Sequence, residues 1–369
     1  MCKVSDLLDF YSTNSLSWDK LEYGTDAIQN LHYGLIHVGL PTMVNLSKDK
    51  LPNIVSGNTP KNYVLCQEGD IAFADASEDT NEVAKAIEFY NLNGKDVICG
   101  LHTIHGRDNQ QKTVVGYKGY AFSSTAFHHQ IRRIAQGTKI YSINSKNFSE
   151  CHIGIPSKEE QKKIATLLRL IDERIATQNK IIEKMQTLIK GIRHDLFKDI
   201  QGEVLALSNI ADIYQPQTIS SSDLTTEGYW VYGANGIIGK YKEYNHETEQ
   251  ICITCRGNTC GTVNYTQPKV WITGNSMVIN TDKYQRQVNK RFLFHYLSAY
   301  NFKSIVSGSG QPQIVRTPLK KIKVTLPSIE KQVQIAHGID LILTKIETEC
   351  TVLGFLESQK QYLLRQMFI

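Results

Sequence analysis

Three cysteines in the second half of the chain have the short spacing from which zinc sites are often built. Cys252, Cys255 and Cys260 lie in the segment ICITCRGNTCGTVNY, which alternates like a β-strand interrupted by a glycine turn. No fourth ligand with zinc-finger spacing follows them. The remaining cysteines are scattered along the chain, which does not indicate a disulfide framework. We interpret the cysteines as small buried residues and predict no metal site, with zinc as the alternative.

Three further patterns resemble catalytic motifs without completing one. The glycine-rich segment 233–241 resembles a phosphate-binding loop, but it has one residue too many between its glycines and ends in tyrosine where magnesium binding needs Ser or Thr. Glu160 and Lys162 have nuclease-like spacing, but no carboxylate on a preceding strand accompanies them. His128 and His129 form an isolated pair, which is more often structural. We therefore predict that the chain has no catalytic residue and binds no cofactor itself.

Polar residues that flank glycines remain after these motifs are set aside. Asn, Gln, Arg, Lys, His and Tyr side chains are the groups that make paired hydrogen bonds to base edges and contacts to phosphates. We predict DNA contacts from His102, His105, Arg107, Asn109, Gln110 and Lys112 in the first half and from Tyr232, Asn235, Lys240, Arg256, Asn258, Thr259, Asn275, Gln311 and Gln313 in the second. The alternative is that each of them is an ordinary surface group.

Two long stretches, 156–197 and 327–368, have the pattern of helices that hold these polar segments in place. Apolar residues recur in them at alternating steps of four and three, which is typical of a helix that packs along one other helix. The predicted seam contains Ile164, Leu168, Ile171, Ile175, Gln178, Ile182 and Met185 in the first stretch and Ile335, Ile339, Ile342, Ile346, Glu349, Leu353 and Leu356 in the second. The polar members Gln178 and Glu349 hold the same place in both stretches. Either they fix the register of the pair or one of them turns to solvent.

The two stretches are copies of each other. Pro327 follows Pro156 by 171 residues, and the sequences align from there without a gap. At the same offset, residues 134–138 match residues 305–309. The chain is therefore built twice, with short β-like runs, glycines and asparagines between the matching parts.

The repeat divides the chain into four parts. We predict mostly β domains at 1–150 and 201–322, and long helices at 151–200 and 323–369. Because both helices carry an apolar seam, we expect them to pair as an antiparallel coiled coil in an α+β fold with a pseudo-two-fold internal repeat. About forty helical residues would span roughly 60 Å. A shared frame with divergent loops indicates two related sites for two different targets, with neutral drift as the alternative.

The composition of the 369-residue chain fits a soluble globular protein. It is 41% hydrophobic and 21% charged, and its formal net charge of +5 permits an anionic partner without requiring one. The N-terminal residues lack the layout of a signal peptide, and no apolar run is long enough to cross a bilayer. We expect a cytoplasmic protein that does not bind a membrane.

A duplicated set of short phrases resembles one known family. The two helix starts read Ile155-Pro-Ser-x-x-Glu-Gln-x-x-Ile-Ala165 and Leu326-Pro-Ser-x-Glu-x-Gln-x-x-Ile-Ala336. Further phrases are Gly69-Asp-Ile71, Gly100-Leu-His-Thr-Ile104, Arg256-Gly257 and Ser307-Gly-Ser-Gly-Gln-Pro312. In this order and along nearly the whole chain, they resemble the DNA-specificity subunit of Type I restriction–modification enzymes.

The resemblance implies a non-catalytic subunit with two target-recognition domains, each of which binds one half of a split, asymmetric sequence in double-stranded DNA. It implies that the coiled coil sets the length of the unread spacer. It also implies two methyltransferase subunits, which use S-adenosylmethionine to methylate adenines, and restriction and translocase subunits, which use ATP and magnesium. One departure is that residues 69–80 are acidic, whereas the second half has Arg256 at the matching place. A symmetric set of DNA contacts is therefore not expected.

Two other interpretations of the sequence remain open. The first is a self-contained methyltransferase or nuclease, against which the missing motifs argue. The chain contains no Pro-Pro pair, and therefore no Asn-Pro-Pro-Tyr-like loop for methylating a base amine. The second is a coiled-coil adaptor that binds proteins only.

Overall fold

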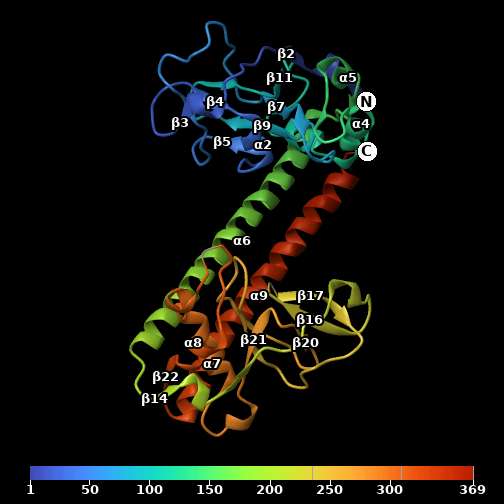
Figure 1. Ribbon diagram of the computed structural model, residues 1–369. Helices are drawn as coiled ribbons and strands as arrows, with labels where there is room; N and C mark the ends of the chain where they lie inside the picture. The colour runs from blue at the N-terminus through green and yellow to red at the C-terminus, as the bar shows by residue number, and fades with distance from the viewer. Residues whose placement is uncertain (235, 309, 369) are drawn as a thin grey trace. The chain divides into compact units, whose positions relative to one another are not determined.

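The computed structural model describes residues 1–234, 236–308 and 310–368 (Figure 1). The chain forms two compact units. Unit 1 comprises residues 1–179 and 351–369, and unit 2 comprises residues 180–350. The divisions fall inside the two long helices, so that each helix contributes one part to each unit.

Unit 1 is built from two sheets, two small strand pairs and short helices. Its strands are β1 (Cys2–Lys3), β2 (Asp9–Tyr11), β3 (Leu21–Glu22), β4 (Gln29–Leu31), β5 (Met43–Asn45), β6 (Asn53–Ile54), β7 (Ile71–Ala74), β8 (Ala76–Ser77), β9 (Ala86–Asn91), β10 (Val97–Cys99), β11 (Thr103–Arg107), β12 (Tyr141–Ser142) and β13 (His152–Ile153). Its shorter helices are α1 (Val4–Leu7), η1 (Trp18–Lys20), α2 (Tyr33–His37), α3 (Lys118–Phe122), α4 (Thr125–Ile134) and α5 (Ser145–Ser149). The sheets have the orders β2-β11-β7-β9-β5 and β10-β4-β6-β3.

Unit 2 repeats this plan with fewer strands. Its strands are β14 (Glu203–Ala206), β15 (Asp212–Tyr214), β16 (Tyr229–Gly233), β17 (Gly236–Tyr241), β18 (Ile251–Thr254), β19 (Val263–Tyr265), β20 (Trp271–Ile272), β21 (Ser276–Asn280) and β22 (Lys323–Leu326). Its shorter helices are η2 (Leu207–Asn209), η3 (Ser221–Asp223), η4 (Asp282–Tyr284), α7 (Lys290–Ala299), η5 (Phe302–Ile305) and α8 (Arg316–Lys320). The sheet order β15-β21-β18-β19 matches β2-β11-β7-β9 of unit 1, which confirms the internal repeat.

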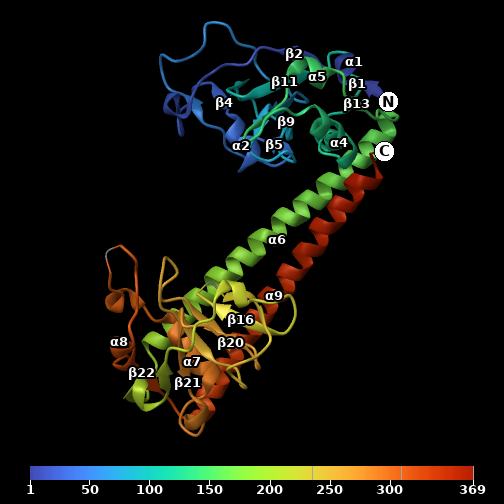
Figure 2. The same ribbon diagram turned by 45° about the vertical axis from the view of Figure 1, so that its right-hand side comes forward.

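The two predicted long helices are α6 (Lys158–Lys198) and α9 (Ile329–Gln366). In unit 2, the strand after α6 pairs with the strand before α9 through Glu203 and Leu326. The end of α6 therefore lies beside the start of α9. In unit 1, Figures 1 and 2 show the end of α9 beside the start of α6. The helices are thus antiparallel in each unit, as the seam predicts, and all of the predicted seam residues are buried or half-buried.

A lysine and an aspartate meet between the two long helices in unit 1. Lys360 stands where the first copy has Ile189. Its Nζ atom lies 2.6 Å from Asp172 Oδ1 and 5.9 Å from the ring centre of Tyr120. The Tyr120 hydroxyl donates a hydrogen bond to the same carboxylate, at 2.8 Å. Since Asp172 faces the α9 part of unit 1, it keeps the cation inside the helix pair.

A buried glutamine fastens each long helix to the body of its unit. Gln161 Oε1 accepts a hydrogen bond from the Val114 N–H (2.9 Å), and its Nε2 donates to two backbone carbonyls. Gln332 repeats this arrangement, accepting from the Asn289 N–H (2.8 Å) and donating to two carbonyls. The sequence match of the two glutamines therefore reflects a duplicated anchor. Val114 lies in a loop, which this hydrogen bond ties to the helix.

Replacing Gln332 by alanine is expected to lower the free energy of unfolding of unit 2 by about 2–4 kcal/mol, because three backbone groups lose their buried partner. Hydrogen exchange of residues 287–289, followed by mass spectrometry, measures the local effect. Gln334→Ala, an exposed position on the same helix, is the matched control and should change little. Equal effects of both substitutions would contradict the anchoring role.

Within the described part of the chain, no helix is both long and apolar enough to span a bilayer.

Candidate nucleic-acid interface

In unit 2, three chain segments meet where β18 ends and β21 begins. Thr254 and Ser276 are paired across these strands. Just beyond them, the Cys255 N–H donates to the Asn275 carbonyl (3.0 Å), and the Ile314 N–H donates to the Cys255 carbonyl (3.0 Å). The turn after β18, the residue before β21 and the segment before α8 are therefore fixed side by side.

The third segment is a loop closed on itself. Ser307 and Gln313 exchange two backbone hydrogen bonds of 2.9 and 2.8 Å. Gly308 has a φ of +92°, and a Cβ atom there would lie 2.5 Å from the Gln311 carbonyl oxygen. Only glycine fits this position without displacing the loop. The Gly257 N–H donates to the Pro312 carbonyl at 3.0 Å, which docks the loop onto the turn after β18.

This frame presents a cluster of exposed polar side chains, which we call the unit 2 surface. Its members are Arg256, Asn258, Thr259, Asn275, Gln311 and Gln313, all predicted as DNA contacts. Among the described residues, no carboxylate forms an ion pair with Arg256. The surface therefore offers a guanidinium fork and several amides, the groups that bind guanine and adenine edges in pairs.

The β16–β17 hairpin adjoins this surface at its turn. The Thr254 hydroxyl donates to the Ala234 carbonyl, and the Ser276 hydroxyl donates to the Gly233 carbonyl at 3.1 Å. Farther along the hairpin, Lys240 Nζ lies 4.7 Å from the ring centre of Trp230. The predicted contact Asn235 lies outside the described residues.

Tyr232 does not belong to the exposed surface. Its side chain is buried with Cys252, Val270, Ile272 and Val278, and this burial raises the pKa of its hydroxyl. The prediction of a direct DNA contact from Tyr232 is therefore corrected, because its ring completes a small core under the hairpin.

Unit 1 contains the same backbone frame. The Asp75 N–H donates to the His102 carbonyl (3.1 Å), the Ile143 N–H donates to the Asp75 carbonyl (3.0 Å), and Gln136 and Ser142 exchange two hydrogen bonds of 2.9 and 2.8 Å. Each of these bonds has a counterpart in unit 2. The frames are thus equivalent residue by residue.

The side chains on the two frames differ. Ala76 pairs with Ser142 in unit 1, at the place where Arg256 pairs with Gln313 in unit 2. His102 takes the place of Asn275, and its Nδ1 lies 3.1 Å from Asp75 Oδ1. A pocket beside it is lined by Tyr33, His37, Val38, Ala76, Ser77, Glu78, Asp79, Glu82, His102 and Ile140. We call this the unit 1 surface; it is acidic and aromatic where the unit 2 surface has arginine and amides.

The predicted polar segment 100–112 does not form one surface. Residues 103–107 are strand β11, which lies between β2 and β7 in the sheet. His102 lies at one end of that strand and Lys112 lies beyond the other, and a strand rises about 3.3 Å per residue. The structure therefore separates His102 from the rest of the predicted set.

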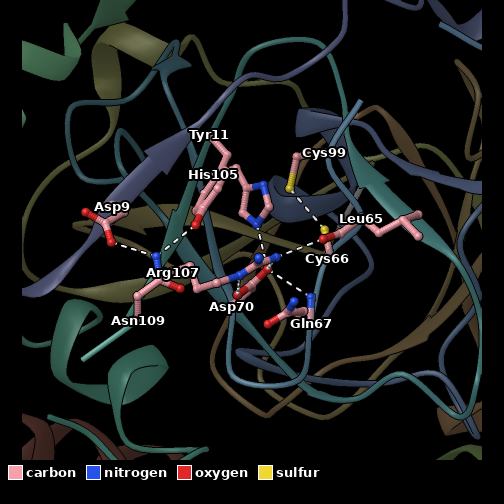
Figure 3. Close-up of polar contacts among 10 residues, drawn as sticks. All are labelled: Asp9, Tyr11, Leu65, Cys66, Gln67, Asp70, Cys99, His105, Arg107 and Asn109. Carbon is pink, nitrogen blue, oxygen red and sulfur yellow. Dashed lines mark hydrogen bonds and ion pairs between the residues drawn. The ribbon is translucent and has the colours of Figure 1, made fainter. Parts of the chain in front are cut away.

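Arg107, the last residue of β11, and the residues beyond it are held by internal hydrogen bonds. Arg107 donates from Nε to Asp70 Oδ1 at 2.8 Å, as Figure 3 shows. Asn109 donates to Asp9 (2.6 Å), and Lys112 donates to the Asp6 carbonyl (2.6 Å). Gln110 is exposed. These residues remain predicted DNA contacts, although three of them would have to exchange an internal partner to bind DNA.

His105 is fully buried, and the prediction that it contacts DNA is corrected. Its side chain is 0% exposed, and its Nε2 lies 2.7 Å from Asp70 Oδ2. Since β11 is an inner strand of the sheet, the alternating direction of its side chains turns His105 inward.

Sequence reasoning missed two features of unit 1. The roles of Ala76 and Ser142 follow only from the structure, because alanine and serine give no signal themselves. Ser142 precedes Gln313 by 171 residues, but Ala76 precedes Arg256 by 180, so the constant offset does not relate the two pairs. Cys66, Cys99 and His105 lie close together in the structure. Nothing in the sequence predicts this, since the spacing of the three residues matches no metal-binding motif.

The two units thus share a duplicated mixed fold and carry two different surfaces at equivalent places. The family described as "Type I restriction modification DNA specificity domain" matches residues 49–187 and 201–354. The chain therefore belongs to this family, and it contains two copies of the domain.

Curated relatives are named as specificity subunits of Type I restriction enzymes. The chain is 30% identical over 147 residues to the Escherichia coli Type I restriction enzyme EcoprrI specificity subunit, a match that covers 38% of this chain and 36% of that protein. It is 27% identical over 313 residues to the putative Methanocaldococcus jannaschii MjaX specificity subunit, covering 76% and 72% of the two chains. The matched region thus spans about a third of the first relative and most of the second.

Solved structures share the fold. The S subunit of a Type I restriction-modification system from M. genitalium has a TM-score of 0.63 at 18% identity, covering 100% of this chain and 95% of that one. A chain from a structure describing complex assembly of a type I R-M system has a TM-score of 0.62 at 14% identity, covering 98% and 95%.

Proposed function

We propose that this chain is the non-catalytic specificity subunit of a Type I restriction–modification enzyme and acts on DNA in the cytoplasm. Each unit binds one half of a split, asymmetric sequence in double-stranded DNA, and the helix pair sets the spacer. One observation carries the proposal. Equivalent backbone frames hold Arg256, Asn275 and Gln313 in one unit, and Ala76, His102 and Ser142 in the other.

The chemistry of the two surfaces suits two different half-sites. Arginine binds guanine through its O6 and N7 atoms, and Asn or Gln binds adenine through N6 and N7. The unit 2 surface offers both kinds of group, with Lys240 available for a phosphate. The unit 1 surface offers His102 and the carboxylates of Glu78 and Asp79, and carboxylates accept hydrogen bonds from the cytosine amino group.

Partner subunits supply the catalysis in this proposal. Two methyltransferase subunits bind S-adenosylmethionine and methylate adenines, and the restriction subunits use ATP and magnesium. Leu170 and Leu341 support a pair of identical partners, because they are equivalent in the repeat and are 51% and 58% exposed on their helices. An exposed leucine at the same place on each long helix offers two identical partners equivalent apolar contacts.

Replacing Arg256 by alanine is expected to weaken binding to the specific sequence by about 5- to 150-fold, which corresponds to about 1–3 kcal/mol for one paired base contact. The measurement is a titration of the complex with methyltransferase subunits against a duplex that contains the mapped methylation sequence. The variant should also lose its preference for one particular base at one position of one half-site.

Arg286→Ala is the matched control, since this exposed arginine of unit 2 lies outside the surface. It should leave the sequence preference unchanged. Loss of affinity without any loss of preference in Arg256→Ala would instead assign the residue to phosphate contact.

A further inference from the structure

A buried cluster in unit 1 combines two thiols with an imidazole. Cys66 Sγ and Cys99 Sγ are 3.6 Å apart. One ligand atom from each of Cys66, Cys99 and His105 lies within 4.8 Å of the other two, and all three residues are buried. Cys99 and His105 lie in consecutive strands, and folding brings the more distant Cys66 beside them (Figure 3).

The spacing of the cluster fits a tetrahedral metal ion. Two thiolates bound to one zinc ion at about 2.3 Å, with tetrahedral angles, have their sulfur atoms roughly 3.8 Å apart. The observed separation of 3.6 Å between Cys66 and Cys99 is close to that value. The two sulfur atoms also cannot form a disulfide at this distance, since an S–S bond is about 2.0 Å long.

The histidine is already oriented as a metal ligand. Its Nε2 is hydrogen-bonded to Asp70, while its buried Nδ1 has no hydrogen-bond partner. Figure 3 shows this second nitrogen on the side of Cys99. A carboxylate that receives the Nε2–H of a ligand histidine fixes its tautomer and leaves the Nδ1 lone pair for the metal. Without a bound metal, this buried nitrogen has lost its contact with water and gained no partner, which lowers the stability of the folded state.

We propose that Cys66, Cys99 and His105 bind a zinc ion in unit 1, with a water molecule as the fourth ligand. Binding releases one proton from each thiol. The charges then cancel, because two thiolates neutralise the dication and Asp70 is neutralised by Arg107, whose NH2 group lies 2.7 Å from Oδ2.

The zinc ion would fasten together two sheets that share no strand. Cys99 ends β10 of the four-stranded sheet, and the Cys66 N–H binds the Val97 carbonyl of the same strand at 2.8 Å. His105 lies in β11 of the five-stranded sheet. The ion would therefore link β10 and β11, which belong to different sheets.

The test uses the full chain co-expressed with its methyltransferase subunit in medium containing zinc, followed by metal analysis of the purified complex. The expected result is one zinc ion per specificity chain, with loss of at least nine tenths of it in Cys66→Ser and in Cys99→Ser. Cys151→Ser is the matched control, because Cys151 is a buried cysteine of the same unit outside the cluster. It should keep the metal.

If the serine variants do not fold, the ligands can still be identified in the unmutated complex by X-ray absorption spectroscopy at the zinc edge. Two sulfur ligands at about 2.3 Å and one nitrogen ligand at about 2.0 Å are expected. Removal of the metal by a chelator should lower the Tm of unit 1 by roughly 5–10 °C. Absence of stoichiometric zinc, zinc retained in both serine variants, or a Cys66–Cys99 disulfide in the native chain would overturn the proposal.

Discussion

Replacing Glu88 by glutamine is expected to lower the free energy of unfolding of unit 1 by about 3–5 kcal/mol. Glu88 is fully buried, and its two oxygens accept hydrogen bonds from the Gly116 N–H (2.9 Å) and the Gly119 N–H (2.8 Å). Lys118, only 3% exposed, lies 3.1 Å from the same carboxylate. Glutamine would turn its amide group toward one of these donors and leave the buried ammonium without a counterion.

Urea denaturation of the full chain, with hydrogen exchange of residues 113–122 as the local reporter, measures this loss. Glu150→Gln is the control, because its ion pair with Lys3 lies on the surface and such pairs contribute little. The double substitution of Glu88 by leucine and Lys118 by methionine should be less harmful than Glu88→Gln, since it removes both buried charges. If Glu88→Gln were neutral, the buried pair would not hold unit 1 together.

Unit 2 is expected to lose about 2–3 kcal/mol of stability through His295 as the pH falls from 7 to 4.5. His295 is fully buried, its Nδ1 is 3.0 Å from an Arg193 nitrogen, and its Nε2 is 2.9 Å from Asp340. Burial, followed by the charge of Arg193, lowers the pKa of His295 from 6.5 to about 4.

The direction of this effect follows from proton uptake. Between pH 6.5 and 4, the unfolded chain binds a proton at His295 that the folded chain does not bind, so acid favours unfolding. His295→Gln should reduce the difference in unfolding free energy between pH 7 and pH 4.5, measured by urea denaturation. The part that remains includes His246, whose pKa burial also lowers to about 4.

His194→Gln is the control for the pH prediction, because His194 is exposed on the same helix as Arg193. It should keep the full pH dependence of the unmutated chain. An unchanged slope in His295→Gln would mean that His295 is not the group that titrates on unfolding.

The parts of the fold that could be predicted from the sequence are those with a regular pattern, namely the heptad spacing of apolar residues and the internal repeat. The heptad pattern predicts α6 and α9 because their seam residues bury one face over many turns. The 171-residue offset predicts the repeat, and it also relates Gln161 to Gln332 and Ser142 to Gln313. These features are regular along the chain, so that one sequence is enough to find them.

The candidate site was only partly predictable, because burial and strand direction depend on distant contacts. The polar residues of 100–112 resemble a loop, but pairing with β2 and β7 makes 103–107 an inner strand. That pairing turns His105 inward and divides the predicted set. In unit 2, the residues around Arg256 are exposed as predicted, since glycines at 257 and 308 form real turns there.

The most direct test of the proposed function is a map of methylated adenines in a host without other adenine methylation. The host would express this chain with its methyltransferase subunit, either unchanged or with residues 215–322 exchanged for those of a relative. We predict a single split motif with a fixed gap, of which the exchange alters only one half. Methylation at a continuous site, an exchange that alters both halves, or methylation that persists without this chain would contradict the proposal that each unit recognises one half-site.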